Sequence, residues 1–131
     1  VKEIIRPAFE KEEGIFVRIA RIILREIKPP RPLSIILFGS FAKGGASADS
    51  DIDIVIIYPR SKNKLIIAKE LSEAEKKITL FFGNHLAGVP LLINEFQNKL
   101  KKKNAFINEI IRTGKVIYGK NISELINEKY C

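Results

Sequence analysis

The sequence predicts an α/β (α+β) domain in which a small mixed β-sheet is flanked by helices. Apolar residues recur at spacings of three and four over residues 10–27, as on one face of an amphipathic helix. Leu33–Phe38 is a short isoleucine-rich run that is typical of a buried strand. Helical and strand-like stretches then alternate along the chain. No repeat or linker divides the 131 residues, so we expect one domain over residues 1–131.

The first half of the chain is punctuated by proline and glycine. The first helix stops before the prolines at positions 29, 30 and 32. The strand Leu33–Phe38 ends at a Gly-Ser pair, after which Ser40–Lys43 forms a short helix and residues 44–50 form a loop of small residues. Alternation in the next strand, Asp51–Tyr58, puts Asp51 and Asp53 on one face.

The second half continues the alternation of helices and strands. Ser61 or Asn63 caps a helix that runs to about Leu80, and residues 83–88 form a turn. The remaining expected elements are the strands Val89–Ile93 and Lys115–Tyr118 and the helices Glu95–Lys102, Ala105–Arg112 and Ile122–Glu128, the last capped by Asn121.

The net charge of +8, from 23 basic and 15 acidic side chains, leaves two interpretations open. A positive field indicates a nucleic-acid or polyanionic partner. Alternatively, abundant Ile, Lys and Glu with no Met or Trp is a surface composition that resembles heat-adapted proteins. No stretch approaches the ~20 apolar residues of a membrane span, and no signal peptide is evident, so we expect a cytoplasmic protein.

Cysteine and histidine are too scarce for several kinds of site. Cys131 is the only cysteine, which excludes a disulfide framework and a cysteine-rich zinc site. His85 is the only histidine, which excludes a multi-histidine metal site. We expect His85 to be a loop or surface residue, with a role at the site as the alternative.

A strand followed by glycine and a helix start favours a phosphate-binding turn. Gly39 allows the backbone to approach a ligand closely, and the free N–H groups of a helix start attract phosphate. The Ser40 hydroxyl adds a donor, and Lys43 could neutralise phosphate oxygens. Two other phosphate motifs fail. A Walker loop needs lysine where Gly45 stands, and a dinucleotide fingerprint needs glycine where Phe41 stands.

The paired aspartates indicate a divalent-metal site. Two ionised carboxylates on one face of a strand repel each other unless a cation lies between them. Magnesium suits Asp51 and Asp53 because it takes oxygen ligands and shares its coordination shell with substrate phosphates. Two such ions, about 4 Å apart, would activate an attacking hydroxyl and stabilise a pyrophosphate leaving group.

The run Gly39-Ser-Phe-Ala-Lys-Gly44 followed by Asp49-Ser-Asp-Ile-Asp-Ile54 resembles the signature of the DNA polymerase beta-like nucleotidyltransferases, in particular the minimal ones. The resemblance covers residues 33–119. It implies a nucleotidyltransferase-like fold and transfer of a nucleotidyl group, usually AMP from ATP, to an acceptor hydroxyl. It also implies that Asp51 and Asp53 hold two magnesium ions, and that Gly39, Ser40, Lys43 and Ser50 contact the nucleotide.

The sequence departs from this family in one respect. Active members usually carry a third carboxylate on a later strand, and Val89–Ile93 contains no acid. Glu95 lies just beyond that strand and is the candidate substitute, with a helix-start acid as the alternative.

Three functions remain open at this stage. The first is an enzyme that adenylylates a hydroxyl, with a small helical partner protein implied by the resemblance. The second is a nucleotide- and metal-binding module that acts by association with such a partner, like an antitoxin. The third is a domain that modifies RNA ends and uses the positive charge.

Overall fold

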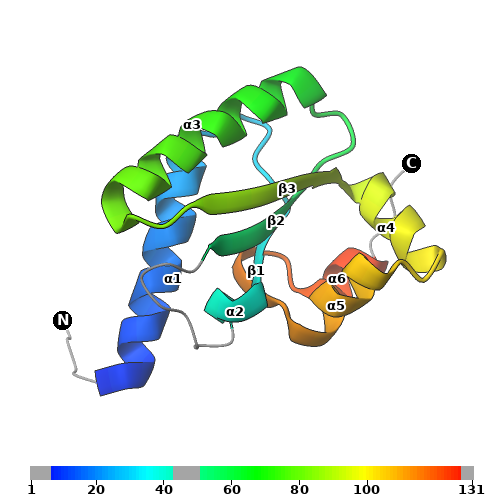
Figure 1. Cartoon of the computed structure of the whole chain (residues 1–131). Coiled ribbons are helices and arrows are strands. Elements are labelled where there is room, and N and C mark those ends of the chain that lie inside the picture. Colours follow the sequence, from blue (N-terminus) through cyan, green and yellow to red (C-terminus); the bar gives the residue numbers. More distant parts are fainter. Residues whose placement is uncertain (1–6, 43–50, 128–131) are drawn as a thin grey trace.

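The computed structural model describes residues 7–42 and 51–127 as alternating helices and strands (Figure 1). The helices are α1 (Pro7–Arg25), α2 (Gly39–Ala42), α3 (Lys64–Phe82), α4 (Ile93–Lys101), α5 (Ala105–Thr113) and α6 (Ile122–Asn127), and the strands are β1 (Ser34–Phe38), β2 (Ile52–Tyr58), β3 (Leu86–Leu92) and β4 (Lys115–Gly119). None of the described helices combines the length and the apolar character that crossing a membrane requires.

The four strands form one mixed sheet in the order β3-β2-β1-β4. β1 is antiparallel to both of its neighbours, whereas β2 and β3 are parallel and pair from Ile52↔Leu86 to Tyr58↔Leu92. The two central strands are apolar almost throughout because both of their faces are covered. The predicted mixed sheet is therefore confirmed.

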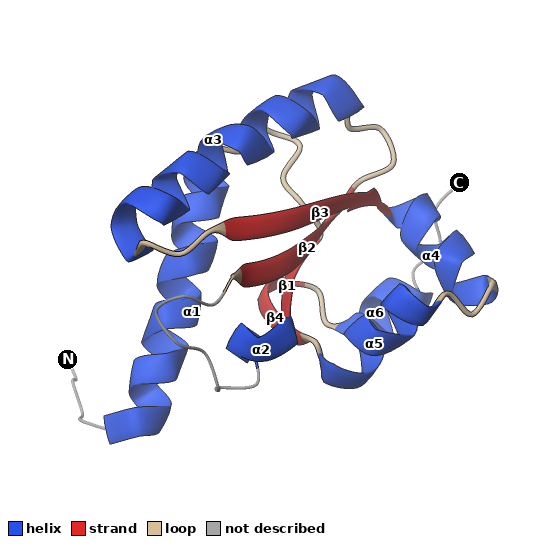
Figure 2. Cartoon of the chain, viewed as in Figure 1, coloured by secondary structure: helices blue, strands red, loops and turns tan. Residues whose placement is uncertain are grey.

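Helices cover both faces of the sheet and create two cores (Figure 2). α1 and α3 pack on the face that carries Ile54 and Ile56 of β2. α4, α5 and α6 pack on the opposite face, with Val55 and Ile57. Successive strand residues point to opposite faces, so the parity of a position in β2 decides which core its side chain enters.

The third strand differs from its prediction. β3 begins at Leu86 rather than Val89, and Ile93 opens α4 instead of ending the strand. Gly88 favours a turn when read alone, yet here it pairs with Ile54 of β2 inside the strand, and α3 packs closely on it. A methyl group at Gly88 would lie 2.8 Å from a Leu71 methyl carbon. The exposed Pro90 fits because β3 is an edge strand.

The predicted capping residues are confirmed at two helix starts. The side chain of Asn63 accepts hydrogen bonds from the N–H groups of Leu65 and Ile66, so Asn63 rather than Ser61 caps α3. Asn121 and Glu124 form a reciprocal capping box before α6.

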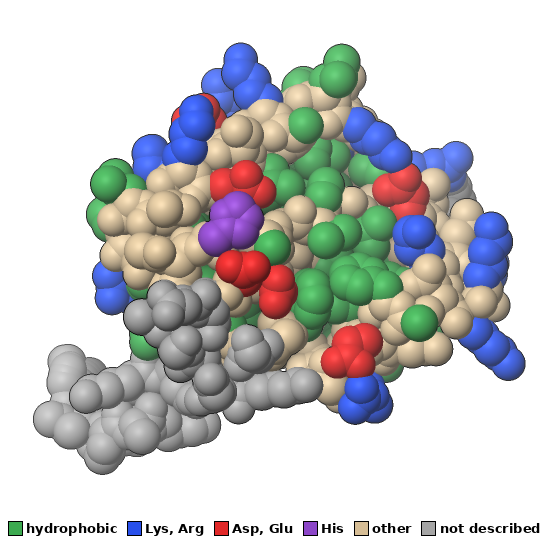
Figure 3. All heavy atoms as spheres, viewed as in Figure 1, with side chains coloured by type: hydrophobic (Ala, Val, Ile, Leu, Met, Phe, Trp, Pro, Cys, Tyr) green, Lys and Arg blue, Asp and Glu red, His purple; other side chains and the backbone are tan. Residues whose placement is uncertain are grey.

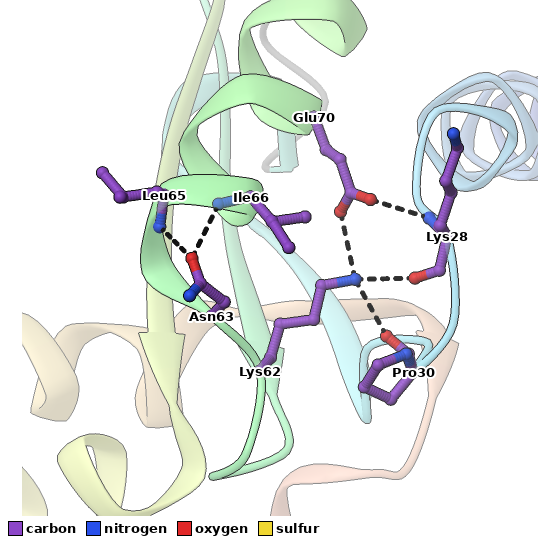
Figure 4. Close-up of polar contacts among 7 residues, drawn as sticks. All are labelled: Lys28, Pro30, Lys62, Asn63, Leu65, Ile66 and Glu70. Carbon is purple, nitrogen blue, oxygen red and sulfur yellow. Dashed lines mark hydrogen bonds and ion pairs between the residues drawn. The ribbon is translucent and has the colours of Figure 1, made fainter.

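A buried ion pair fastens the proline-rich segment between α1 and β1 to α3 (Figure 4). Lys62 Nζ lies 3.2 Å from a carboxylate oxygen of Glu70, and both side chains are almost fully buried. The same ammonium donates to the carbonyl oxygens of Lys28 and Pro30, at 2.6 and 3.2 Å. The Lys28 N–H donates to Glu70 at 2.9 Å. These bonds fix the path by which the chain enters the sheet.

Candidate active site

Two carboxylates stand at the beginning of β2, as the alternation predicts. Asp51 is exposed directly before the strand, and Asp53 is half-buried as its second residue. Asp53 has the parity of Val55 and Ile57, which are fully buried under the helices of the second core. Both aspartates therefore lie on one face of the sheet, where its cover of helices gives way to solvent.

The end of β1 meets this pair through Gly39. Phe38 pairs with Asp53 across the two strands, and Gly39 follows as the first residue of α2 with a positive φ of 76°. A methyl group at Gly39 would lie 2.5 Å from Oδ2 of Asp53. Only glycine combines this backbone conformation with this approach to the carboxylate.

Phe38 anchors the end of β1 against helix α5. Its ring contacts the Phe106 ring of α5 in an edge-to-face arrangement, with the two centroids 5.4 Å apart. The strand end that carries Gly39 is thus held between α5 and β2. The order of strand, glycine and short helix expected of a phosphate-binding turn is present in residues 34–42.

His85 joins the aspartates through the parallel pairing of β2 and β3. The N–H group of Ile52 donates a 2.8 Å hydrogen bond to the carbonyl oxygen of His85. Because Ile52 and Leu86 are register partners, the residues before them, Asp51 and His85, are neighbours at the same edge of the site. Figure 3 shows acidic side chains around the one histidine on this face.

The electrostatics of Asp53 suit a bound cation. Burial raises the pKa of the Asp53 carboxyl, the negative charge of Asp51 raises it further, and the charge of His85 lowers it in part. The balance is a raised pKa, which means that the ionised pair is unfavourable by itself. A divalent cation would remove this cost, and oxygen donors at the half-open end of a strand fit magnesium.

The strand next to Asp53 supplies no third carboxylate. Its register partner on β3 is Ala87, and β3 contains no acidic residue. Within the part of the chain that the structure describes, no three His, Cys, Asp or Glu side chains are grouped to hold a metal ion. A metal bound by Asp51 and Asp53 would complete its shell with phosphate oxygens and water.

Glu95, the substitute considered from the sequence, lies at the opposite end of β3 from the aspartates. β2 and β3 run parallel, and the aspartates stand at the beginning of β2, whereas Glu95 follows the end of β3. There it accepts hydrogen bonds from Lys64 Nζ and from the N–H group of Leu92. Burial alone would raise the pKa of Glu95, but these bonds and the charges of Lys64 and Lys99 lower it.

The other predicted nucleotide contacts are only partly described. Ser40 lies in α2, beside Gly39. Lys43 and Ser50 lie outside the described residues. His85 is exposed in the loop directly before β3, so the expected loop or surface position is confirmed. The register of β3 against β2 nevertheless brings His85 beside Asp51, which the sequence did not show.

Comparisons with known proteins show what the chain resembles. The family model of the nucleotidyltransferase domain matches residues 17–113. A Methanocaldococcus jannaschii protein that carries the name "putative protein adenylyltransferase" is 31% identical to this chain over 90 residues. The matched residues are 68% of this chain and 60% of that protein. The chain thus spans about 60% of the length of the curated relative that it matches.

Two solved structures share the fold. One is a toxin–antitoxin complex with AMP-PNP, matched with a TM-score of 0.57 and 19% identity over 84% of this chain and 80% of that chain. The other holds a tri-AMPylated HEPN toxin of Shewanella oneidensis in complex with an MNT antitoxin. It matches with a TM-score of 0.50 and 17% identity, over 89% of this chain and 79% of that chain.

Proposed function

This chain belongs to the nucleotidyltransferase domain family, and on that premise we propose that it transfers AMP from ATP to a hydroxyl group of a partner protein. The observation that carries the proposal is the contact between Gly39 and the Asp53 carboxylate. It joins the expected phosphate turn to the expected metal ligands at one edge of the sheet. The adenylyltransferase name of the archaeal relative and the AMPylated toxin in one structural neighbour support a protein as the acceptor.

The proposed reaction is an in-line displacement at the α-phosphorus of ATP. The acceptor oxygen forms a bond to that phosphorus, the bond to the bridging oxygen of the β-phosphate breaks, and pyrophosphate leaves. The hydroxyl proton passes to solvent or to a neighbouring base. Asp51 and Asp53 would hold magnesium, which when bound neutralises phosphate charge and favours loss of the hydroxyl proton. The space beside Gly39 is taken by the Asp53 carboxylate, which brings the proposed metal ligand next to the turn, and Ser40 is a candidate donor to the triphosphate.

A second candidate is a domain that binds nucleotide and metal without efficient transfer. The alanine that faces Asp53 on β3, where a third carboxylate would complete the metal site, favours this candidate. In that case the chain would act on its partner by association. The two candidates agree on binding and differ on whether pyrophosphate appears.

One experiment separates them. Calorimetric titration of the wild type with ATP and magnesium measures binding, and pyrophosphate release is followed in the same samples with a candidate helical partner added. The Asp51→Asn/Asp53→Asn variant is the control and should lose both signals. Binding without release under every acceptor condition would support the binding-only module. No binding by the wild type would contradict both candidates.

A further inference from the structure

A cavity of about 320 Å³ opens between α1 and β4, apart from the aspartates. Its apolar lining comes from Val17 and Leu24 of α1 and from Ile117 of β4. Val17 is 49% exposed although it is apolar, so this lining is open to solvent. Tyr118, which is half-buried, closes the side formed by the sheet.

Three arginines surround this apolar lining: Arg21, Arg25 and Arg31. All three are exposed, and Arg21 and Arg25 stand four residues apart on α1, so their side chains share one face of the helix. In the part of the chain that the structure describes, none of the three forms an ion pair or stacks on a ring. Arg18, by contrast, lies over the Phe82 ring at 5.2 Å. We call the cavity with these arginines the arginine pocket.

The backbone on both sides of Arg31 is held by hydrogen bonds. On one side, Lys62 Nζ donates to the carbonyl oxygen of Pro30 (Figure 4). On the other, the Leu33 N–H donates a 2.7 Å hydrogen bond to the carbonyl oxygen of Ile57. The arginines of the pocket are therefore carried by helix α1 and by a backbone segment tied to the core. A backbone that is held before binding lowers the entropic cost of ordering the site.

The arginine pocket and the aspartates lie on different faces of the sheet. Tyr118 packs against the core shared by α1 and α3, whereas Asp53 has the parity of the opposite core. Along β1, Tyr118 pairs with Ile35 and Asp53 with Phe38, which separates them by roughly 10 Å in the strand direction. A molecule bound in the arginine pocket would leave the metal site free.

We propose that the arginine pocket binds an acidic amphipathic segment of a partner protein. An apolar side chain of the segment would contact Val17 and Leu24, and flanking carboxylates would pair with the three arginines. The planar guanidinium group matches a carboxylate through two parallel hydrogen bonds. The apolar lining favours a peptide over a nucleic acid, because phosphates would gain nothing from it and Tyr118 offers only one ring for stacking. The proposal does not depend on catalytic transfer.

The test uses a fluorescently labelled helical peptide that carries leucines on one face and flanking glutamates, with binding measured by anisotropy. We expect Arg21→Glu/Arg25→Glu to weaken binding by at least about tenfold. The matched control, Lys69→Glu/Lys101→Glu, makes the same change of net charge at exposed sites elsewhere and should weaken binding by less than about threefold. Circular dichroism and thermal unfolding confirm that both variants fold.

Further samples make the result decisive. A peptide with glutamine in place of glutamate, and one with alanine in place of leucine, should each bind at least about tenfold more weakly. The Asp51→Asn/Asp53→Asn variant should bind the acidic peptide as the wild type does, which separates this proposal from the proposed transfer. Three results would overturn the proposal. They are equal losses of binding in the two charge variants, no peptide binding by the wild type, and stronger binding of an oligonucleotide that depends on the same arginines.

Discussion

The carboxylate of Asp53 occupies the space that a side chain at Gly39 would need, since a methyl group there would lie 2.5 Å from Oδ2. Gly39 also has a φ of 76°, a conformation that other residues adopt only with strain. The end of β1 and the start of β2 thus form one unit, in which the expected phosphate turn and the expected metal ligand determine each other's position.

Gly39→Ala should damage both stability and binding. The positive φ alone costs about 1 kcal/mol, and the overlap with Asp53 adds roughly 1–3 kcal/mol. Gly83→Ala is the matched control, because Gly83 has a φ of 78° and nothing within 4 Å of an added methyl group. Urea unfolding and titration with magnesium ATP should show a larger loss at position 39. Equal effects of the two substitutions would contradict the Gly39–Asp53 contact.

Asp53→Asn should abolish magnesium-dependent nucleotide binding without weakening the metal-free fold. The pKa of Asp53 is raised in the folded state, so its contribution to stability is present below the ordinary value of 3.8 and is lost as pH rises through the folded pKa. At neutral pH the substitution removes an unfavourable charge. Thermal unfolding in EDTA should therefore give an equal or higher Tm for the variant, and a lower Tm would refute this account of the pair.

Ala87→Asp should strengthen the metal site. Ala87 is the register partner of Asp53 on a parallel strand, so its side chain shares the face of the aspartates. A third carboxylate there should raise magnesium affinity roughly tenfold and lower the metal-free stability through repulsion. Ala87→Asn, similar in size but uncharged, is the control. Calorimetry that gives the two variants the same affinity would mean that position 87 does not face the metal.

Lys62→Met should destabilise the fold strongly. Removing Lys62 leaves the Glu70 carboxylate buried without its partner, which costs about 3–5 kcal/mol. The exposed pair of Lys76 and Glu73 provides the control, since Lys76→Met should change stability by less than about 1 kcal/mol. Urea unfolding measures both, and the double variant Lys62→Met/Glu70→Met should recover much of the loss. Similar values for the two single variants would show that burial does not matter here.

Tyr58→Phe should be neutral or stabilising. The Tyr58 hydroxyl is buried without a hydrogen-bond partner in the described part of the chain, so its removal should gain up to about 1 kcal/mol. Burial and the charge of Glu70 raise the pKa of Tyr58 above its ordinary value of 10.0. Wild-type stability should therefore fall as pH rises above about 10, because only the unfolded chain ionises there.

The Tyr58→Phe variant should lose this part of the pH dependence. Urea unfolding at pH 8 and pH 10.5 checks both expectations, with Tyr118→Phe as the control for removing a half-buried tyrosine. A marked loss of stability in Tyr58→Phe at pH 8 would mean that the hydroxyl has a partner after all.

The local sequence determined most of the elements and half of the proposed site. Helix periodicity, the isoleucine-rich strands and the caps at Asn63 and Asn121 depend on neighbours within a few residues, so they could be predicted. The pairing of Asp51 with Asp53 also follows from the two-residue period of a strand. The order of strand, Gly39-Ser40 and short helix could also be predicted, because glycine and proline punctuation is local.

The register between strands far apart in the sequence was decided only by the tertiary structure. Parallel pairing of β2 with β3 brings His85 beside Asp51, puts Ala87 opposite Asp53 and leaves Glu95 at the other end of the strand. Pairing with Ile54 of β2 places Gly88 in a strand where a turn was predicted, and Leu71 packs closely on it. The arginine pocket likewise needed α1, β4 and the segment before β1 to meet. Such contacts depend on how whole elements pack, and no local pattern encodes them.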